Sequence, residues 1–442
     1  MKGGIGKYLA GHAEPEAASG ELPVTLGESD GVVVIPAYDE PATLTETLER
    51  LPAGLLTVLV INAPPGAEGR NAALFQALDV RPADGVFNVR HIAGPVLVVN
   101  RSTTPLPPRQ GVGLARKIGA DIALRLMADH VLPVTWIHST DADVTLPPDY
   151  ALAAPAVDDG VAALVYPFEH VAPNGLGNAM ARYEIALHHY VLGLALAGSG
   201  YAHHTIGSTI AFHPVHYALC RGFPKRAAGE DFYLLNKLAK LGAVRQLASP
   251  FITVSGRASA RVPVGTGPNV ARIDAMDDPE QTYRYYNPQV FTALAEVLAR
   301  LRHLALPADT TMPYTPFGAP TAEVTHLVER WWRAAGVEDV LDRANVRTPA
   351  QRSHLLGEWF DGFRTMRFIH EVRDAGLASV TLAELCEAWR VPATSDPTPL
   401  LSRLRRLCFT DWAAGRLPGG TLAPLQNPGN RRFSGRDGTG NG

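Results

Sequence analysis

Residues 32–40 read Val-Val-Val-Ile-Pro-Ala-Tyr-Asp-Glu, and the organisation of the chain follows from this run. Its first four residues are β-branched, which is typical of a strand buried on both faces of a parallel sheet. Pro41 then suits the first position of a helix, and Leu44, Leu48 and Leu51 follow at helical spacing. The run therefore predicts a strand, a loop and a helix in succession.

The same alternation continues along the chain. Apolar runs at 56–61, 96–99 and 134–137 predict three further strands, and the apolar spacing over 113–127 predicts a helix. Strands that alternate with helices indicate an α/β domain with a mainly parallel sheet. Because ligands of such sheets bind at the carboxyl ends of the strands, the loops after the first, second and fourth strands are the first places to look for chemistry.

Four parts of the chain differ in texture. Residues 1–30 lack periodicity and predict a loose lead-in, and residues 31–284 form the predicted α/β domain. Helical apolar spacing recurs over 285–415 and predicts an additional α-helical C-terminal region. Residues 416–442 are rich in Gly, Asn, Pro and Arg, a composition that predicts a disordered tail.

Composition excludes several classes of protein. The 442 residues carry 40 Lys and Arg against 43 Asp and Glu, so no global positive field favours nucleic acid as a partner. The three cysteines, Cys220, Cys386 and Cys408, form no CxxC pair and suggest neither a disulfide framework nor a thiolate zinc site. Neither a signal peptide nor an apolar run of about 18 residues is apparent, so we expect a soluble cytoplasmic protein without a transmembrane segment.

Two carboxylates follow the fourth predicted strand. Asp141 and Asp143 are separated by one residue, and in an extended stretch alternate side chains share a face. Such a pair can bind Mg²⁺ or Mn²⁺ and leave coordination positions open for phosphate oxygens. The alternative is that both aspartates only cap turns in a loop.

Four segments in order resemble family 2 glycosyltransferases. Residues 32–40 are similar to the opening strand and loop of that family, with Asp39 in place of its usual Asn. Residues 113–120 resemble its Ala-Arg-Asn-x-Gly helix start, and Asp141-Ala142-Asp143 resembles its metal motif. Residues 229–232, Gly-Glu-Asp-Phe, resemble its acceptor-side Glu-Asp motif, so the resemblance covers roughly Gly31 to Gly267.

The resemblance implies a GT-A fold, which is Rossmann-like with a mainly parallel sheet flanked by helices. It also implies that the first loop lines the nucleotide of a sugar donor, through Pro36, Ala37, Tyr38 and Glu40. After the second strand the family often carries Asp-Asp-Gly-Ser, whereas this chain has Asn62 there, which offers both an amide and a carbonyl to a base. The alternative for the first loop is a helix N-cap with acidic residues.

Further donor contacts are implied on the diphosphate side. By analogy with the family, Arg116 near a helix start would meet the diphosphate or the sugar, and Asp141 and Gly207 would also line the donor. Arg257 and Arg261 could belong to a lid that closes on the diphosphate. The alternatives are a solvated surface arginine at 116 and a plain surface loop at 257–261.

Glu230 and Asp231 are the candidate catalytic residues. Asp231 lies near the start of a helical stripe, which lowers a carboxyl pKa, whereas Glu230 beside it and desolvation by substrate raise that pKa. Asp231 could therefore act as a general base that takes the proton of an acceptor hydroxyl. The alternative is that either acid is a helix N-cap.

These features predict a metal-dependent glycosyltransferase. It would move a sugar from a UDP- or GDP-type nucleotide-sugar donor to an unknown acceptor hydroxyl, by an inverting single displacement. A sugar-phosphate nucleotidyltransferase and a non-catalytic binding or scaffold protein are the alternatives. The C-terminal helices could also assemble a homo-oligomer.

Overall fold

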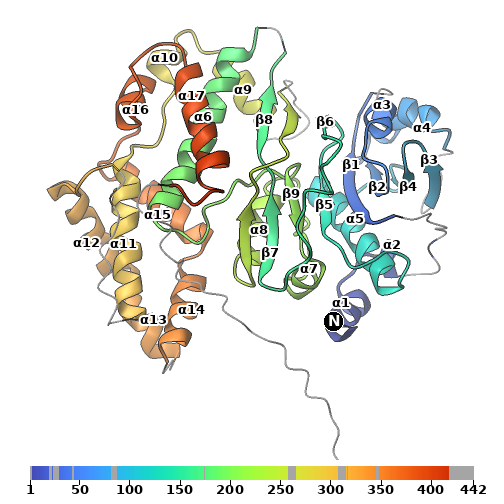
Figure 1. Cartoon of the computed structure of the whole chain (residues 1–442), viewed down its shortest axis with the longest axis horizontal. Coiled ribbons are helices and arrows are strands. Elements are labelled where there is room, and N and C mark those ends of the chain that lie inside the picture. The colour runs from blue at the N-terminus through green and yellow to red at the C-terminus, as the bar shows by residue number, and fades with distance from the viewer. Residues whose placement is uncertain are drawn as a thin grey trace, which may run out of the picture.

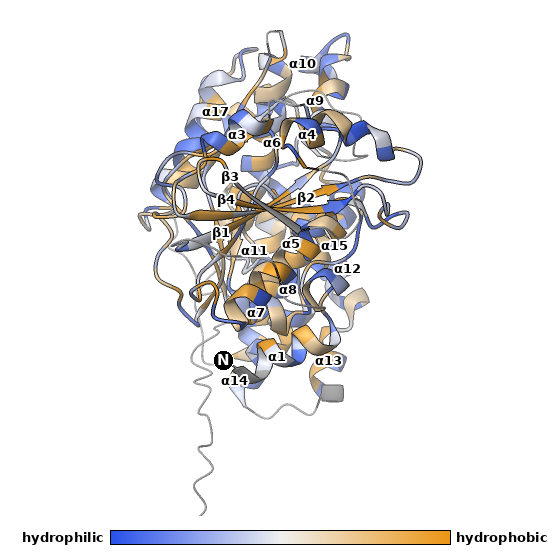
Figure 2. Ribbon diagram, turned by 90° about the vertical axis from the view of Figure 1, so that its right-hand side faces the viewer, coloured by the Kyte–Doolittle hydropathy of each residue, from blue (hydrophilic) through white to orange (hydrophobic). Residues whose placement is uncertain are grey.

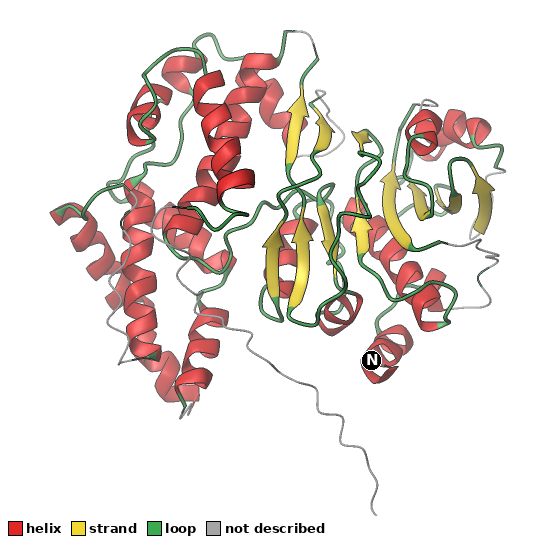
Figure 3. Ribbon diagram, in the orientation of Figure 1, coloured by secondary structure: helices red, strands yellow, loops and turns green. Residues whose placement is uncertain are grey.

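The computed structural model shows an α/β body joined to a helical C-terminal region (Figure 1). The body contains a large sheet and a small sheet, and the helices of the C-terminal region gather at one end of the molecule (Figure 3). The structure describes residues 2–18, 22, 29–41, 44–80, 87–173, 175–256, 265–306, 315, 317–344 and 348–417.

The large sheet has eight strands, and its parallel part carries the four strands expected from the sequence. β1 lies at its centre, parallel to β2 on one side and to β5 on the other. The expected fourth strand begins later than predicted, at Ile137. In order across the sheet the strands are β10 (Ala243–Gln246), β7 (Val161–Val165), β9 (Ile210–Phe212), β5 (Ile137–Ser139), β1 (Gly31–Ala37), β2 (Leu55–Asn62), β4 (Pro95–Arg101) and β3 (Phe87–His91).

A small sheet extends the fold beyond the carboxyl ends of the central strands. β11 pairs with β6 in antiparallel and with β8 in parallel orientation. Its three strands are β6 (Val144–Thr145), β11 (Ile252–Ser255) and β8 (Phe168–Val171). Because β6 begins one residue after Asp143, the expected acidic loop connects the two sheets.

Helices cover both faces of the large sheet. The strands appear edge-on between two helical layers, with α5, α7 and α8 on one side and α3 and α4 on the other (Figure 2). Alternate residues of β1 enter opposite cores, Val32 and Val34 on the α5 side and Val33 and Ile35 on the other. These helices are α3 (Leu44–Glu49), α4 (Ala72–Ala77), α5 (Gly111–Ala128), α7 (Pro214–Leu219) and α8 (Glu230–Leu238).

The helix predicted over 113–127 is α5, and a glycine sets its distance from the sheet. A Cβ on Gly119 would collide with the side chain of Val34 in β1. The helix can therefore approach the strand closely only with glycine at this position. This approach holds the start of α5 against the carboxyl ends of β1 and β5.

The N-terminal segment is not the loose lead-in expected from its sequence. It contains α1 (Lys2–Gly11) and α2 (Pro15–Ala18), and α1 packs against α5 and α7. The hydroxyl of Tyr8 donates to Asp121 at 2.6 Å, and Nζ of Lys117 donates to the same carboxylate at 2.6 Å. Buried polar bonds hold this helix in place, which is why apolar periodicity did not indicate it.

The C-terminal region is helical, as predicted. Most of its helices form an apolar core of their own, but Leu382 and Leu400, in the last two helices, belong to the core of the body, and α17 packs on α6. Most of the expected disordered tail, from residue 418 on, lies outside the described residues. The remaining helices are α6 (Gly177–Leu196), α9 (Thr266–Asp274), α10 (Pro279–Thr282), α11 (Gln289–Ala305), α12 (Ala322–Ala335), α13 (Val337–Ala344), α14 (Pro349–Trp359), α15 (Gly362–Asp374), α16 (Leu382–Ala388) and α17 (Thr398–Arg405), which continues as a π-helical turn, η2 (Arg406–Asp411).

Within the described ranges, no helix combines the length and the apolarity that crossing a bilayer requires.

Candidate functional site

Arg116 lies at the centre of a polar cluster where α5, α8 and the end of β5 meet. Its guanidinium is almost fully buried and reaches two carboxylates: Nε donates to Glu230 at 3.0 Å, and Nη2 donates to Asp141 at 2.6 Å. Nη1 donates to the Ser139 hydroxyl at 2.7 Å and to the Thr140 carbonyl at 3.2 Å. The alternative of a solvated surface arginine is therefore wrong, and Arg116 brings the acceptor-side and metal-side candidates together.

Lys117, next to this arginine, points elsewhere. Its ammonium lies in the buried network with Tyr8 and Asp121 that holds α1. The structure thus separates the two adjacent cations, one to the candidate site and one to the N-terminal helix.

Asp231 occupies the first turn of α8, two residues after the N-cap Gly229, whose φ of 72° is left-handed. Burial, the larger cause, and the charge of the neighbouring Glu230 together raise the pKa of Asp231 to about 7. Two effects lower the pKa of Asp231: the hydrogen bond that its carboxylate accepts from the backbone N–H of Phe232 at 2.7 Å, and the charge of Arg116. A carboxyl with this pKa is balanced between its acid and base forms at neutral pH.

Asp141 and Asp143 do not lie in an extended stretch, so the expectation that they alternate as on a strand is wrong. Residues 142 and 143 form a turn between β5 and β6, and the N–H of Val144 donates to the Asp141 carbonyl at 3.4 Å. Although Asp141 is paired with buried Arg116, its side chain stays 40% exposed. Asp143 is partly exposed as well. Two partly exposed carboxylates in one turn fit the ligand preference of Mg²⁺ and Mn²⁺.

Gly207 lies against the guanidinium of Arg116. A Cβ at this position would be 2.7 Å from Nη2 and 3.0 Å from Cζ. Glycine is therefore needed for the segment before β9 to pass over the arginine. The structure thus places Gly207 beside Arg116, and its contact with a donor stays a prediction.

The first loop divides into a buried and a partly exposed half. Pro36 and Ala37 are buried in β1, where they pair with Val60 and Ile61 of β2, so they are strand residues and not loop residues as expected. Pro36 is tolerated there because β5 pairs only with Val32–Val34, so no ladder bond needs its missing N–H. Tyr38, Asp39 and Glu40 follow with partly exposed side chains.

Asp39 makes the sharp change of direction at the end of β1. Its φ is 54°, a conformation in which Asp and Asn are favoured among residues other than glycine. Its N–H donates to the side chain of Asn71 at 2.9 Å, and its carboxylate accepts from Arg70 at 2.8 Å. The loop conformation therefore suits Asp39 as well as the Asn that the resemblance led us to expect.

Asn62 is buried and serves the backbone. Its side-chain amide donates to the backbone carbonyl of Ala37 at 3.1 Å, while its backbone carbonyl accepts from the side-chain amide of Asn71 at 2.9 Å. This bonding ties the ends of β1 and β2 together. The expectation that the Asn62 amide faces a nucleotide base does not match, because that amide bonds to the strand end.

The predicted lid arginines, Arg257 and Arg261, lie outside the described residues. His203 and His204, in the segment before β9, are both buried. Burial also lowers the pKa of His203 to about 4.

Sequence reasoning missed several residues of the cluster. Ser139 and Thr140 could have been found, because they end a strand whose neighbours had been singled out. Tyr183 of α6 carries no sequence signal, yet it lies within the electrostatic influence of Asp231 and hydrogen-bonds with Thr266. Only the packing of α6 against α9 brings these two residues together.

Comparisons with known proteins gave likenesses in structure only. No family model matches the sequence, and no curated protein matches it. Among solved structures, S. aureus TarS 1–349 shows 12% identity and a TM-score of 0.32 over 78% of this chain and 89% of that chain. TarS 1–349 in complex with UDP-GlcNAc shows 11% identity and a TM-score of 0.35 over 82% and 92%. TarS 1–349 in complex with UDP shows 12% and 0.31 over 87% and 92%. The residues of the site, and not these likenesses, carry the functional proposal.

Proposed function

We propose that the chain is a glycosyltransferase that moves a sugar from a nucleotide-sugar donor to an acceptor hydroxyl. The observation that carries the proposal is the buried Arg116, which joins Glu230 of α8 to Asp141 at the end of β5. Beside this pair lies Asp231, whose pKa is raised to about 7 mainly by burial. A candidate base and a candidate diphosphate site therefore share one cluster at the carboxyl ends of the strands, where ligands of α/β sheets bind.

Asp231 is the general base of the proposed reaction. Its carboxylate accepts the proton of the acceptor hydroxyl while that oxygen forms a bond to the anomeric carbon. The bond from the anomeric carbon to the phosphate oxygen breaks, and its electron pair leaves with the nucleoside diphosphate. This single displacement inverts the anomeric centre.

Arg116 and Glu230 are positioning residues. The guanidinium orients Asp141 on one side and Glu230 on the other, and the negative charge of Glu230 raises the pKa of the adjacent Asp231. Because Gly207 has no side chain, the guanidinium of Arg116 can lie against its backbone without being displaced. The partly exposed residues Tyr38 and Glu40 are proposed to face the nucleotide.

We propose Mg²⁺ or Mn²⁺ as the cofactor, with Asp143 as its main ligand. Asp141 is the second ligand, although its ion pair with Arg116 offsets part of its charge. A divalent cation at these carboxylates would supply positive charge to the departing diphosphate. The donor is of the UDP or GDP type in this proposal.

The test is nucleoside diphosphate release from a panel of UDP- and GDP-sugars, with the full chain and Mn²⁺ or Mg²⁺. Asp231→Asn is expected to lower the rate at least about 100-fold while donor binding persists. Asp143→Ala is expected to raise the concentration of Mn²⁺ that gives half the maximal rate. Asp278→Asn is the matched control, because Asp278 caps the distant α10 and Asn caps helices equally well. Donor turnover that is unchanged in both site variants, or absent with every donor, would contradict the proposal.

A further inference from the structure

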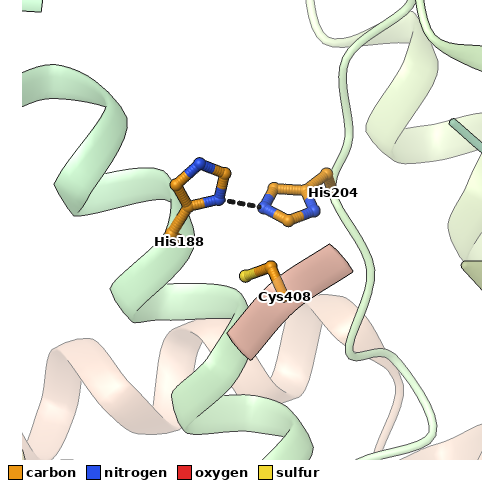
Figure 4. Close-up of side chains that lie close together, drawn as sticks. All are labelled: His188, His204 and Cys408. Carbon is orange, nitrogen blue, oxygen red and sulfur yellow. Dashed lines mark hydrogen bonds between the residues drawn. The ribbon is translucent and has the colours of Figure 1, made fainter. Parts of the chain in front are cut away.

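Three buried potential metal ligands meet between α6, the segment before β9 and the C-terminal turn η2. They are His188, His204 and Cys408, and their side chains point toward one another (Figure 4). Nδ1 of His188 lies 3.0 Å from Nε2 of His204, and the three ligand atoms lie within 4.8 Å of one another. The cluster is separate from the residues of the proposed reaction.

A carboxylate orients the first histidine from behind. Nε2 of His188 lies 3.0 Å from Oε1 of Glu184, which directs the proton of the ring to that nitrogen. Arg405 and His170 hold Glu184 from two other directions. The opposite nitrogen of His188, Nδ1, is therefore left with its lone pair toward His204. A carboxylate behind a histidine is the usual second layer of a metal site.

While His188 is neutral, the second histidine lacks a satisfactory arrangement without a metal cation. Nε2 of His204 must carry the proton if it donates to Nδ1 of His188, and its own Nδ1 is then an acceptor. Among the described residues, this Nδ1 and the neighbouring Oε1 of Gln246 are both buried without a hydrogen-bond partner. The amide nitrogen of Gln246 already donates to the carbonyl of Val165, so it cannot turn toward the ring.

A cation between the rings would resolve both unpartnered atoms. It would take the lone pairs of Nδ1 of His188 and Nε2 of His204, so the His204 proton would move to Nδ1 and point at Oε1 of Gln246. Two nitrogens on a tetrahedral zinc ion lie roughly 3.3 Å apart, so the observed separation needs a change of only a few tenths of an ångström. Cys408 would bind as the thiolate after releasing its proton to solvent.

We propose that His188, His204 and Cys408 bind one transition-metal ion, with zinc as the metal that two imidazoles and a thiolate favour. The aromatic rings of Phe168 and Phe409 pack on the two histidines and close the cluster to solvent. The role that follows is structural: the ion ties η2 to α6 and fixes the segment that leads, three residues later, to Gly207. Sequence spacing gave no sign of it, because the ligands are far apart in the chain.

The first test is the metal content of the full chain, measured by mass spectrometry after purification and desalting without chelator. We expect roughly one zinc ion per chain, and at least a tenfold lower content for Cys408→Ser. Cys386→Ser is the matched control, because Cys386 is equally buried but belongs to α16, outside the cluster. A zinc content that is negligible in the parent chain, or that falls equally in the control, would overturn the proposal.

The second test needs no variant and does not depend on glycosyl transfer. The full chain is unfolded, stripped of metal and refolded with Co²⁺. Tetrahedral cobalt with a thiolate ligand gives visible absorption bands and a near-ultraviolet charge-transfer band, which we expect at one equivalent of cobalt. Added zinc should remove these bands by displacing cobalt. A refolded chain that shows only the spectrum of aqueous cobalt would overturn the proposal, whatever its activity.

Discussion

Two opposing effects decide the ionisation of one residue, Asp231. Its place in the first turn of α8 and the positive charge of Arg116 favour the carboxylate, whereas burial and Glu230 favour the neutral acid. The second pair of effects is stronger, so the pKa rises to about 7. A base must be deprotonated to work, so we expect the rate of transfer to rise with pH and to level off above about pH 7.

Initial rates with saturating donor and acceptor, from about pH 5 to about pH 9, check this expectation. Asp278→Asn should reproduce the parent profile. A rate that stays flat through pH 7, or that falls as pH rises, would mean that Asp231 is not the base.

The raised pKa also has a consequence for stability. Between the unfolded pKa of Asp, about 3.9, and the folded value of about 7, the folded state holds more protons than the unfolded state. Stability contributed by this residue is therefore lost as pH rises through that window. Asp231→Asn removes the ionisation, so its melting temperature relative to the parent should increase from pH 4 to pH 8. Thermal unfolding at both pH values measures the difference, and an equal difference at the two would contradict the assignment.

Gly207 tests the geometry of the guanidinium. In Gly207→Ala the new Cβ would meet Nη2 of Arg116 at 2.7 Å, so the arginine must shift away from Asp141. We expect a loss of stability of about 1–3 kcal/mol and a drop in the rate of transfer. Gly177→Ala is the control, because a Cβ on Gly177, at the start of α6, meets nothing within 4 Å. Denaturant unfolding and donor turnover measure both effects, and equal behaviour of the two variants would argue against the packing.

The sequence predicted those residues of the cluster that lie at the end of a strand or at the start of a helix. Asp141 follows a buried strand and Asp231 follows a glycine before a helical stripe, and both lie in one cluster as their positions suggested. The sequence did not predict Asn71 or Tyr183, because each reaches the site through tertiary packing of an element that has no motif. Asn62 was assigned a ligand role because its amide can bind a base, but the nearer carbonyl of Ala37 takes that amide.

At the scale of elements, apolar periodicity located the strands and helices that hydrophobic burial stabilises, and it missed a helix that polar contacts stabilise. β1 and α5 were predicted because their apolar side chains enter the two cores of the large sheet. α1 contains four glycines and has a weak apolar pattern, and yet Tyr8 on it is buried. The helix forms because Asp121 of α5 offers bonding partners in the interior.

This network gives a prediction for α1. The hydroxyls of Tyr8 and Tyr217 both donate to Oδ1 of Asp121, at 2.6 Å and 2.8 Å. Tyr8→Phe and Tyr217→Phe should each lower the free energy of unfolding by about 1–2 kcal/mol. Because both act on one carboxylate oxygen, the double variant should differ from the sum of the single variants by about 0.5 kcal/mol or more. Urea unfolding of the four proteins measures this coupling, and strict additivity would show that the two hydroxyls act independently.

For the whole molecule, the helical C-terminal region is bound into the body, although composition sets it apart. Leu400, Leu404 and Phe409 belong to the same apolar core as the sheet residues Ile35 and Leu59. The helical apolar spacing that recurs after residue 285 predicted a boundary near that residue. The return of the chain to α6 could not be predicted, because no local pattern records which helix a later helix will contact.

Arg405 allows a test of the contact between α17 and α6. Its Nε and Nη2 donate to the fully buried carboxylate of Glu184 in α6, at 2.5 Å and 2.9 Å. Together with hydrogen bonds from His170 and His188, Arg405 holds the pKa of Glu184 well below its usual range, against the effect of burial. Arg405→Met leaves a buried carboxylate with its two histidines alone, so we expect a loss of about 3 kcal/mol. Arg406→Met should change stability by less than about 0.5 kcal/mol, because Arg406 is exposed.

Unfolding of both variants, followed by circular dichroism and by tryptophan fluorescence, separates the possible behaviours. All six tryptophans except Trp136 lie in the C-terminal region, so fluorescence reports mainly on that region while circular dichroism reports on the whole chain. If α17 joins the two parts into one cooperative unit, the two signals of Arg405→Met should shift together to lower denaturant concentration. A fluorescence transition that moves alone would show that the C-terminal helices unfold independently of the sheet, and that the contact between α17 and α6 contributes little to the stability of the body.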